Sequence, residues 1–296
     1  MTNNSVHIKH RLEYLLFLIF ANLFKWIGLQ RTRRLSKYLA YIVFYLIPLR
    51  KKIVFNNIKS AFPEKSTAEI NALTFRTYQN ILITFFELMI LPFLSEKELI
   101  SSVTFVNYDL LQRVSNNHKG VMLLSGHLGG WEFCPSSITI MLGRKLFILA
   151  KPQSNPLTSN WVMNAREKFG NKVILSGISV KNIYKKIKEG EIVIVGGDQR
   201  GNYEGPRFRF FNRSTALYLG AASIALKTNC PVILTIFERQ SDYSYKIYFE
   251  ELDLMNLSDS YDKNVLEVTQ RYISSLERYI KKNPEQYFWL HKLWKY

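Results

Sequence analysis

The segment GVMLLSGHLGGWEF, residues 120–133, places a histidine and a glutamate where a buried strand would give way to a helix. His127 follows the apolar run 121–124, and imidazole is the side chain best suited to take a proton near neutral pH. On one continuous helix, Glu132 would point away from His127. If His127 instead lies on the turn and Glu132 in the first helical turn, the two can meet, and the carboxylate would then orient the imidazole.

Gly129 and Gly130 stand between these two side chains. They would let the backbone approach a substrate closely, and N–H groups at the start of the helix could bind an oxyanion. The alternative is an ordinary core histidine beside a glycine-rich turn, which an isolated His–x4–Glu pattern favours. The strand context and a second cluster favour catalysis. Cys134 has no evident basic neighbour and is expected to be a core residue.

The second cluster follows another apolar run, 192–195, and reads Gly196-Gly197-Asp198-Gln199-Arg200. Asp198 therefore lies at a strand's carboxyl edge, where sites in α/β folds gather. Arginines crowd the loop after it and could bind phosphates, although any one of them could equally be a solvated charge. Arg166, on an amphipathic stretch before Gly170, adds to a potential anion site with Lys151 and Lys168, although each of these could equally be a surface charge.

The part of the chain that carries these residues alternates between short apolar runs and helix-length stretches. Strands are expected at residues 121–124, 146–150, 173–175, 192–195, 231–237 and 245–249. Helices are expected at about 130–142, 155–169, 179–189, 214–228 and 262–282. The alternation predicts an α/β fold with a central mixed sheet and helices on both faces.

Before this region, a capping-box pattern at Ser66 opens a helix that is expected to run to about residue 91. Its apolar second half contains a single acidic residue, Glu87. A buried carboxylate is costly unless it is paired, so we expect a basic partner in the core in preference to a role in substrate or helix positioning.

The N-terminal region is strongly apolar. Residues 12–29 are borderline in length for a transmembrane helix, and the basic residues that follow would leave the rest of the chain in the cytoplasm. Residues 39–49 are too short to span and suggest an interfacial helix, followed by a basic collar at 50–52. We therefore expect residues 1–52 to be a membrane anchor and residues 53–296 to be the catalytic domain. The alternative is that both apolar runs are core helices of a soluble domain.

The chain carries 40 Lys and Arg against 23 Asp and Glu, a formal charge of +17. Such an excess implies an acidic partner, which from composition alone could be nucleic acid, an anionic bilayer or an acidic protein. The two cysteines form no metal or redox motif, and a reducing compartment suits them.

Taken together, the sequence resembles the late acyltransferases of lipid A biosynthesis, the HtrB/LpxL-like family within the lysophospholipid acyltransferase group. The matching stretches occur in order along nearly the whole chain: the AFPE segment, LLSGHLGGWEF, NPLTSNWVMNAREKFG, VGGDQR and PEQYFWLHKLWK. The chain departs from the family pattern at Arg200, where many members have a second Asp, and in the loop GNYEGPRFRF.

The resemblance implies that His127 is the general base and Glu132 its orienting carboxylate. It also implies that Arg166 and Asp198, with Gln199 and Arg200, support the site or bind substrate, and that no metal or organic cofactor is needed. The acyl donor would be acyl carrier protein, and the acceptor would be a hydroxyl of an anionic membrane glycolipid at the bacterial inner membrane.

Two alternatives remain. The same chemistry could act on another glycolipid or lysophospholipid, such as a mannosylated inositol lipid, or the chain could be a non-catalytic, membrane-tethered binder of anionic polymer. A protein that used only its charge would need neither the glycine-flanked histidine nor Asp198. We therefore expect an enzyme that binds acyl carrier protein and membrane, and no nucleic acid.

Overall fold

The computed structural model describes residues 3–47, 49–117, 120–175 and 180–294. The first residue of the helix expected at 179–189, Pro48 in the second apolar run and the last two residues of the chain lie outside this part.

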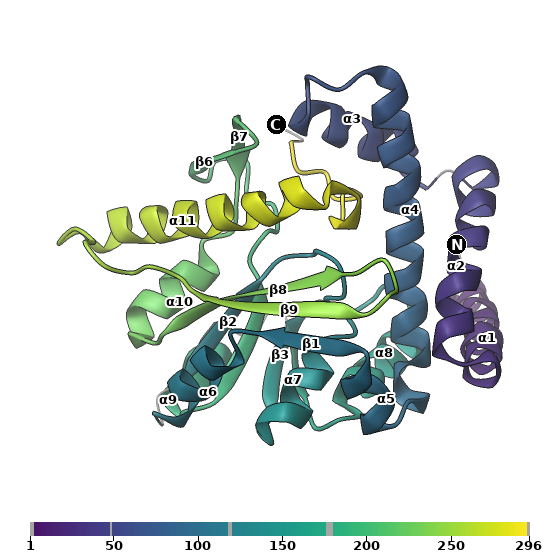
Figure 1. Cartoon of the computed structure of the whole chain (residues 1–296), viewed down its shortest axis with the longest axis horizontal. Coiled ribbons are helices and arrows are strands. Elements are labelled where there is room, and N and C mark those ends of the chain that lie inside the picture. The colour runs from purple at the N-terminus through teal and green to yellow at the C-terminus, as the bar shows by residue number, and fades with distance from the viewer. Residues whose placement is uncertain (1–2, 48, 118–119, 176–179, 295–296) are drawn as a thin grey trace.

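A seven-stranded sheet organises the molecule (Figure 1), and its strands follow the order β1-β9-β8-β2-β5-β3-β4. The strands are β1 (Val103–Val106), β2 (Val121–Ser125), β3 (Leu146–Ala150), β4 (Lys172–Leu175), β5 (Ile192–Gly196), β8 (Val232–Arg239) and β9 (Tyr245–Glu251). All neighbouring strands pair in parallel except β8 and β9, which pair antiparallel. The predicted mixed sheet is therefore confirmed.

Helices cover both faces of this sheet. Those after the N-terminal region are α4 (Thr67–Ile90), α5 (Glu96–Ser101), α6 (Tyr108–Asn116), α7 (Pro135–Leu142), α8 (Pro156–Glu167), α9 (Val180–Lys188), α10 (Gly220–Thr228) and α11 (Tyr261–Lys282). Alternate residues of the buried strands enter two separate cores. Leu124 packs with the cluster that includes α10 and α11, and Leu123 packs with the cluster that includes α7. This alternation is the two-residue period of a strand buried on both sides.

The helix expected at about 130–142 begins only at Pro135, and two further features of the fold differ from the expectation. Residues 214–216, expected to start a helix, belong to β7 (Arg213–Ala216), which forms a separate hairpin with β6 (Arg207–Phe210). Phe211 and Asn212, between the two strands, have positive φ angles of 52° and 56°, which suits a tight hairpin turn. Strand β1 was not expected. It lies at the edge of the sheet, where it pairs with β9.

The N-terminal region forms α1 (Asn3–Ile27), α2 (Leu29–Leu46) and α3 (Lys51–Ala61). Gly28, at a φ of 79°, separates the first two helices. Both helices contact α4, beside which they lie at the right of Figure 1. Within the described residues, the structure contains no helix with the length and apolar character needed to cross a membrane.

Helix α1 is apolar on two sides. Phe24 is fully buried, and its ring lies 4.5 Å from that of Phe86 on α4. On the other side, Leu12, Ile19 and Trp26 are 62%, 57% and 84% exposed. One side of this helix therefore belongs to the core, while the other presents apolar side chains to the surroundings.

Candidate active site

The edge of the sheet where β2 and β5 end brings His127 and Asp198 together. The two strands are parallel neighbours with Ser125 opposite Gly196, and each of the two polar residues follows two positions after that pair. The shared offset places them side by side although 71 residues separate them in the chain. This is the strand-end location expected for both.

Asp198 binds His127 through both carboxylate oxygens. The Nδ1 atom of His127 lies 2.7 Å from Oδ1, and the backbone N–H of His127 donates to Oδ2 at 2.9 Å. The Asp198 side chain is 3% exposed and that of His127 is 21% exposed. The carboxylate therefore fixes the tautomer in which Nδ1 carries the proton, and Nε2 keeps a lone pair.

The electrostatics of the pair favour a charged imidazole. Burial opposes the charge on His127, but Asp198, helped by Glu132, outweighs this and raises the pKa of the imidazole above its usual 6.5. Burial likewise opposes the charge on Asp198, yet the imidazole and its hydrogen bonds lower the pKa of this carboxyl to about 2. Asp198 therefore remains ionised and can stabilise an imidazolium as it forms.

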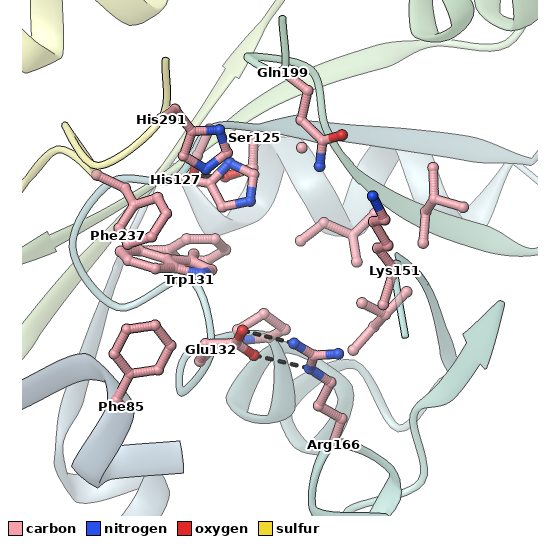
Figure 2. A pocket seen from close by; sticks show the side chains of 18 of the residues that line it. Phe85, Ser125, His127, Trp131, Glu132, Lys151, Arg166, Gln199, Phe237 and His291 are labelled. Atoms are coloured by element: carbon pink, nitrogen blue, oxygen red, sulfur yellow. Dashed lines mark hydrogen bonds and ion pairs between the residues drawn. The ribbon is translucent and has the colours of Figure 1, made fainter. Parts of the chain in front are cut away.

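The prediction that Glu132 orients His127 is wrong in its geometry. Both oxygens of Glu132 accept hydrogen bonds from Arg166, at 2.6 and 2.8 Å, and each side chain of this pair is 11% exposed. Figure 2 shows this bidentate pair across the cavity from the imidazole. Glu132 lies in the turn before α7 and not in the first helical turn as expected, and the order of the strands brings Asp198 to His127 in its place.

The predicted oxyanion site at the two glycines is also contradicted. The Gly129 N–H donates to the carbonyl of Gln286 at 3.0 Å, and the Gly130 N–H donates to the carbonyl of Phe237 at 3.2 Å. Gly129 has a φ of 61°, and a Cβ atom there would lie 1.7 Å from the Phe237 oxygen. The glycines thus let the turn pack against β8, and their N–H groups are occupied by that packing.

A cavity of about 300 Å³ opens in front of His127. The predicted residues Glu132, Arg166 and Gln199 line it, together with Lys151 and His291 (Figure 2). Asp198 lies behind the imidazole. Arg200 is not among the described lining residues, and its Nη1 donates to the carbonyl of Lys292.

The rest of the cavity wall is largely apolar. Trp131 and Phe288 have ring centroids 5.5 Å apart, and Phe85 lies 6.3 Å from Phe288. Phe237 and aliphatic side chains of β3 and β5 complete the lining. The cavity thus offers one basic imidazole, a few polar groups and a wall suited to hydrocarbon.

Sequence reasoning gave no role to His291, and it noted Lys151 only as one of several basic residues. The signal for His291 was its place in the aromatic segment PEQYFWLHKLWK, and the signal for Lys151 was its position directly after β3. In the part of the chain that the structure describes, no group of three or more His, Cys, Asp or Glu side chains gathers in a way that could hold a metal ion.

Comparison with known proteins identifies the family. The model of the family described as bacterial lipid A biosynthesis acyltransferase matches residues 1–296. The chain belongs to this family. The acyltransferase is 24% identical over 259 residues to the lipid A biosynthesis lauroyltransferase of Escherichia coli K12, with 83% of this chain and 79% of the relative covered.

Two other relatives from the same organism are similar to this acyltransferase. It is 21% identical over 249 residues to the lipid A biosynthesis palmitoleoyltransferase, with 83% of this chain and 79% of the relative covered. It is 21% identical over 243 residues to the lipid A biosynthesis myristoyltransferase, with 81% of this chain and 73% of the relative covered. The names of these three relatives differ in the acyl group.

Proposed function

We propose that this acyltransferase moves a fatty acyl chain from acyl carrier protein to a hydroxyl of a lipid A precursor, with His127 as general base. The observation that carries the proposal is the His127–Asp198 pair, in which Nδ1 is held by the carboxylate and Nε2 is left for the cavity. The family match supports acyl transfer, and the relatives' names support the class of acceptor.

The chemistry needs one base and one place for negative charge. His127 Nε2 takes the proton of the acceptor hydroxyl, and that oxygen adds to the carbonyl carbon of the donor thioester. The carbonyl electron pair moves to its oxygen, returns as the C–S bond breaks, and the leaving thiolate takes the proton from His127. Asp198 stabilises the imidazolium between these two transfers.

The charge of the protein supports an acidic donor. At a formal +17, the chain attracts an acidic carrier protein and anionic lipid head groups at long range. Glu132 and Arg166 neutralise each other, which leaves Lys151 as a cation on the cavity wall opposite His127 (Figure 2). We propose that Lys151 and Gln199 contact the polar part of the bound substrates.

The test is transfer by the purified protein. Lauroyl-, myristoyl- and palmitoleoyl-acyl carrier protein are each supplied with a lipid A precursor, and the mass of the lipid product is measured by mass spectrometry. We expect one donor to be preferred, and His127→Ala to lower kcat by about 10⁴-fold. Full activity of His127→Ala would refute the assignment of the base. Product only on a different glycolipid or a lysophospholipid would refute the acceptor.

We also propose that the protein binds the cytoplasmic side of the bacterial inner membrane through the exposed apolar side of α1 and α2. Along α1 this side comprises Leu12, Leu15, Leu16, Ile19, Leu23 and Trp26, which recur at helical spacing. On α2 it continues with Tyr38, Tyr45 and Leu46, which are 65–76% exposed. Exposed apolar side chains in this number are typical of an interaction surface, and the exposed basic residues Arg31 and Arg34 follow in the first turns of α2.

Flotation with vesicles that contain anionic lipid tests this second proposal. The variant Leu12→Ser, Leu16→Ser, Ile19→Ser, Trp26→Ser should lose most of its binding. The matched control, Met255→Ser with Leu266→Ser, removes exposed apolar side chains elsewhere and should bind as the wild type does. Equal flotation of all three proteins would refute the assigned surface.

A further inference from the structure

The C-terminal segment is joined to the turn that carries His127 by backbone hydrogen bonds. The Phe288 N–H donates to the His127 carbonyl at 2.9 Å, and Leu128 forms an antiparallel bridge with Tyr287. From the other side, the Asn57 amide donates to the carbonyls of Trp289 and His291 at 2.8 and 2.6 Å. These contacts fix where the next side chains of the segment lie.

One of those side chains is His291, which faces the same cavity as His127. The two imidazole centroids are 5.2 Å apart, and the ring of Phe288 packs edge-on against His291 at 4.8 Å. The imidazole of His291 lines the cavity and makes no hydrogen bond to any described residue. A half-buried imidazole without a partner, held against the base, is suited to meet a substrate atom.

The charge state of His291 is also set by its surroundings. Burial, with the positive charges of His127, Arg50 and Arg200, lowers the pKa of this imidazole to about 4, although Asp198 opposes the shift. At neutral pH the ring is therefore uncharged and has one N–H to donate. A neutral imidazole can polarise a carbonyl oxygen without giving up its proton.

Several other donors on the turn are already engaged. The N–H groups of His127, Gly129 and Gly130 donate to Asp198 and to backbone carbonyls, and the Nδ1 proton of His127 is held by Asp198. These groups are therefore not available to the oxyanion that forms when the acceptor oxygen adds to the acyl carbonyl, and a donor on a side chain that faces the cavity can stabilise it instead.

We propose that His291 is a further catalytic residue, whose neutral N–H stabilises the oxyanion during acyl transfer. This inference rests on the proposed function. The carbonyl electron pair moves to the oxygen beside His291 when the acceptor adds, and it returns to expel the thiolate. His291 keeps its proton throughout, while His127 accepts and returns the transferred proton.

Steady-state kinetics of three substitutions test the proposal with the donors and lipid A precursor used above. His291→Leu removes the donor, whereas His291→Gln and His291→Asn place an amide N–H near the positions of Nε2 and Nδ1. We expect His291→Leu to lower kcat by about 10²-fold or more with KM changed less than about threefold, as for the loss of one oxyanion donor. We expect one of the two amides to recover at least about tenfold of that loss.

The control is Lys292→Gln, an exposed neighbour on the same segment, which should keep the wild-type kcat. Thermal melting checks that each variant is folded. If His291→Leu does not fold, the proposal is tested by the ratio of kcat between His291→Gln and His291→Asn. The two amides place their N–H groups at different positions, so a positioned donor must distinguish them. A ratio below about two overturns the proposal.

Equal loss in the folded Leu, Gln and Asn variants, or a wild-type kcat in His291→Leu, also overturns it. The proposed function has its own readout in the same assay. If wild-type transfer does not depend on His127, the general base is wrong. If transfer depends on His127 but not on His291, only the present inference fails.

Discussion

Two buried carboxylates hold basic groups in this molecule, and they do so in different ways. Asp198 holds His127 at the rim of the cavity, where the imidazole is 21% exposed and one of its nitrogens is left open. Glu87 on α4 is fully buried and binds Arg33 of α2 at 2.7 Å and Arg239 of β8 at 3.3 Å. The first arrangement leaves one nitrogen open to the cavity. The second is buried within the protein, where Nη1 and Nη2 of Arg33 have no hydrogen-bond partner among the described residues.

The buried cluster around Glu87 continues beyond its ion pairs. Tyr245 donates to Glu87, and the Arg33 guanidinium lies 5.2 Å from the centroid of the Phe133 ring. Thr84 accepts from Arg239, and its hydroxyl lies 3.0 Å from the carbonyls of both Asn80 and Gly129, so the cluster reaches the turn that carries His127. The comparison suggests that Asp198 serves chemistry, whereas Glu87 serves the structure that positions it.

We expect the largest effect on catalysis from Asp198→Asn. The amide cannot stabilise the imidazolium and can impose the wrong tautomer, so kcat should fall by about 10³–10⁴-fold while the protein remains folded. Because the carboxylate is lost, the pKa of His127 should fall, and the acid limb of kcat/KM should move to lower pH. The measurement is a pH series of kcat/KM, with Asp259→Asn at the exposed surface as control. A variant with wild-type kcat would remove Asp198 from the mechanism.

Glu87→Ala should lower the stability of the protein strongly and its kcat only slightly. It leaves two buried arginines without their carboxylate, so the free energy of unfolding should fall by about 3–5 kcal/mol. The kcat of the folded fraction should change less than about tenfold, because Glu87 does not line the cavity. Chemical denaturation measures the first quantity. Glu267→Ala, in an exposed ion pair with Arg271, should cost less than about 1 kcal/mol. Similar costs for both substitutions would mean that burial of the cluster adds no stability.

Thr84→Val tests the hydrogen bonds that join the Glu87 cluster to the turn that carries His127. The substitution leaves the Gly129 carbonyl and an Arg239 N–H short of a partner and should cost about 1–3 kcal/mol of unfolding free energy. The matched control is Thr77→Val on the same helix, because the Thr77 hydroxyl is buried without a hydrogen-bond partner among the described residues. That control should be neutral or stabilising, and a cost equal to that of Thr84→Val would show that the link contributes nothing.

The smallest effect is expected at Glu132 and Arg166, which line the cavity yet neutralise each other. Glu132 raises the pKa of His127 and Arg166 lowers it. A neutral base is required, so Glu132→Gln should move the acid limb of kcat/KM to lower pH and Arg166→Gln should move it to higher pH. The double variant should lie between them. Shifts in the same direction for both single variants would contradict the pairing.

The local elements of this protein could be predicted from its amino-acid sequence. Short apolar runs predicted β2, β3 and β5 nearly to their ends, and the capping box predicted the start of α4. The single acidic residue in the apolar second half of α4 predicted a basic partner. His127 and Asp198 could each be placed at a strand end, because a strand and the turn after it depend on residues close in the chain.

Only the tertiary structure decided which groups meet. The adjacency of β2 and β5, with Ser125 opposite Gly196, gives His127 its carboxylate from 71 residues away and leaves Glu132 to Arg166. The packing of the 127–130 turn against β8 and the C-terminal segment occupies the glycine N–H groups and brings His291 to the cavity. Strand order and long-range packing set these contacts, and no local pattern in the chain records them.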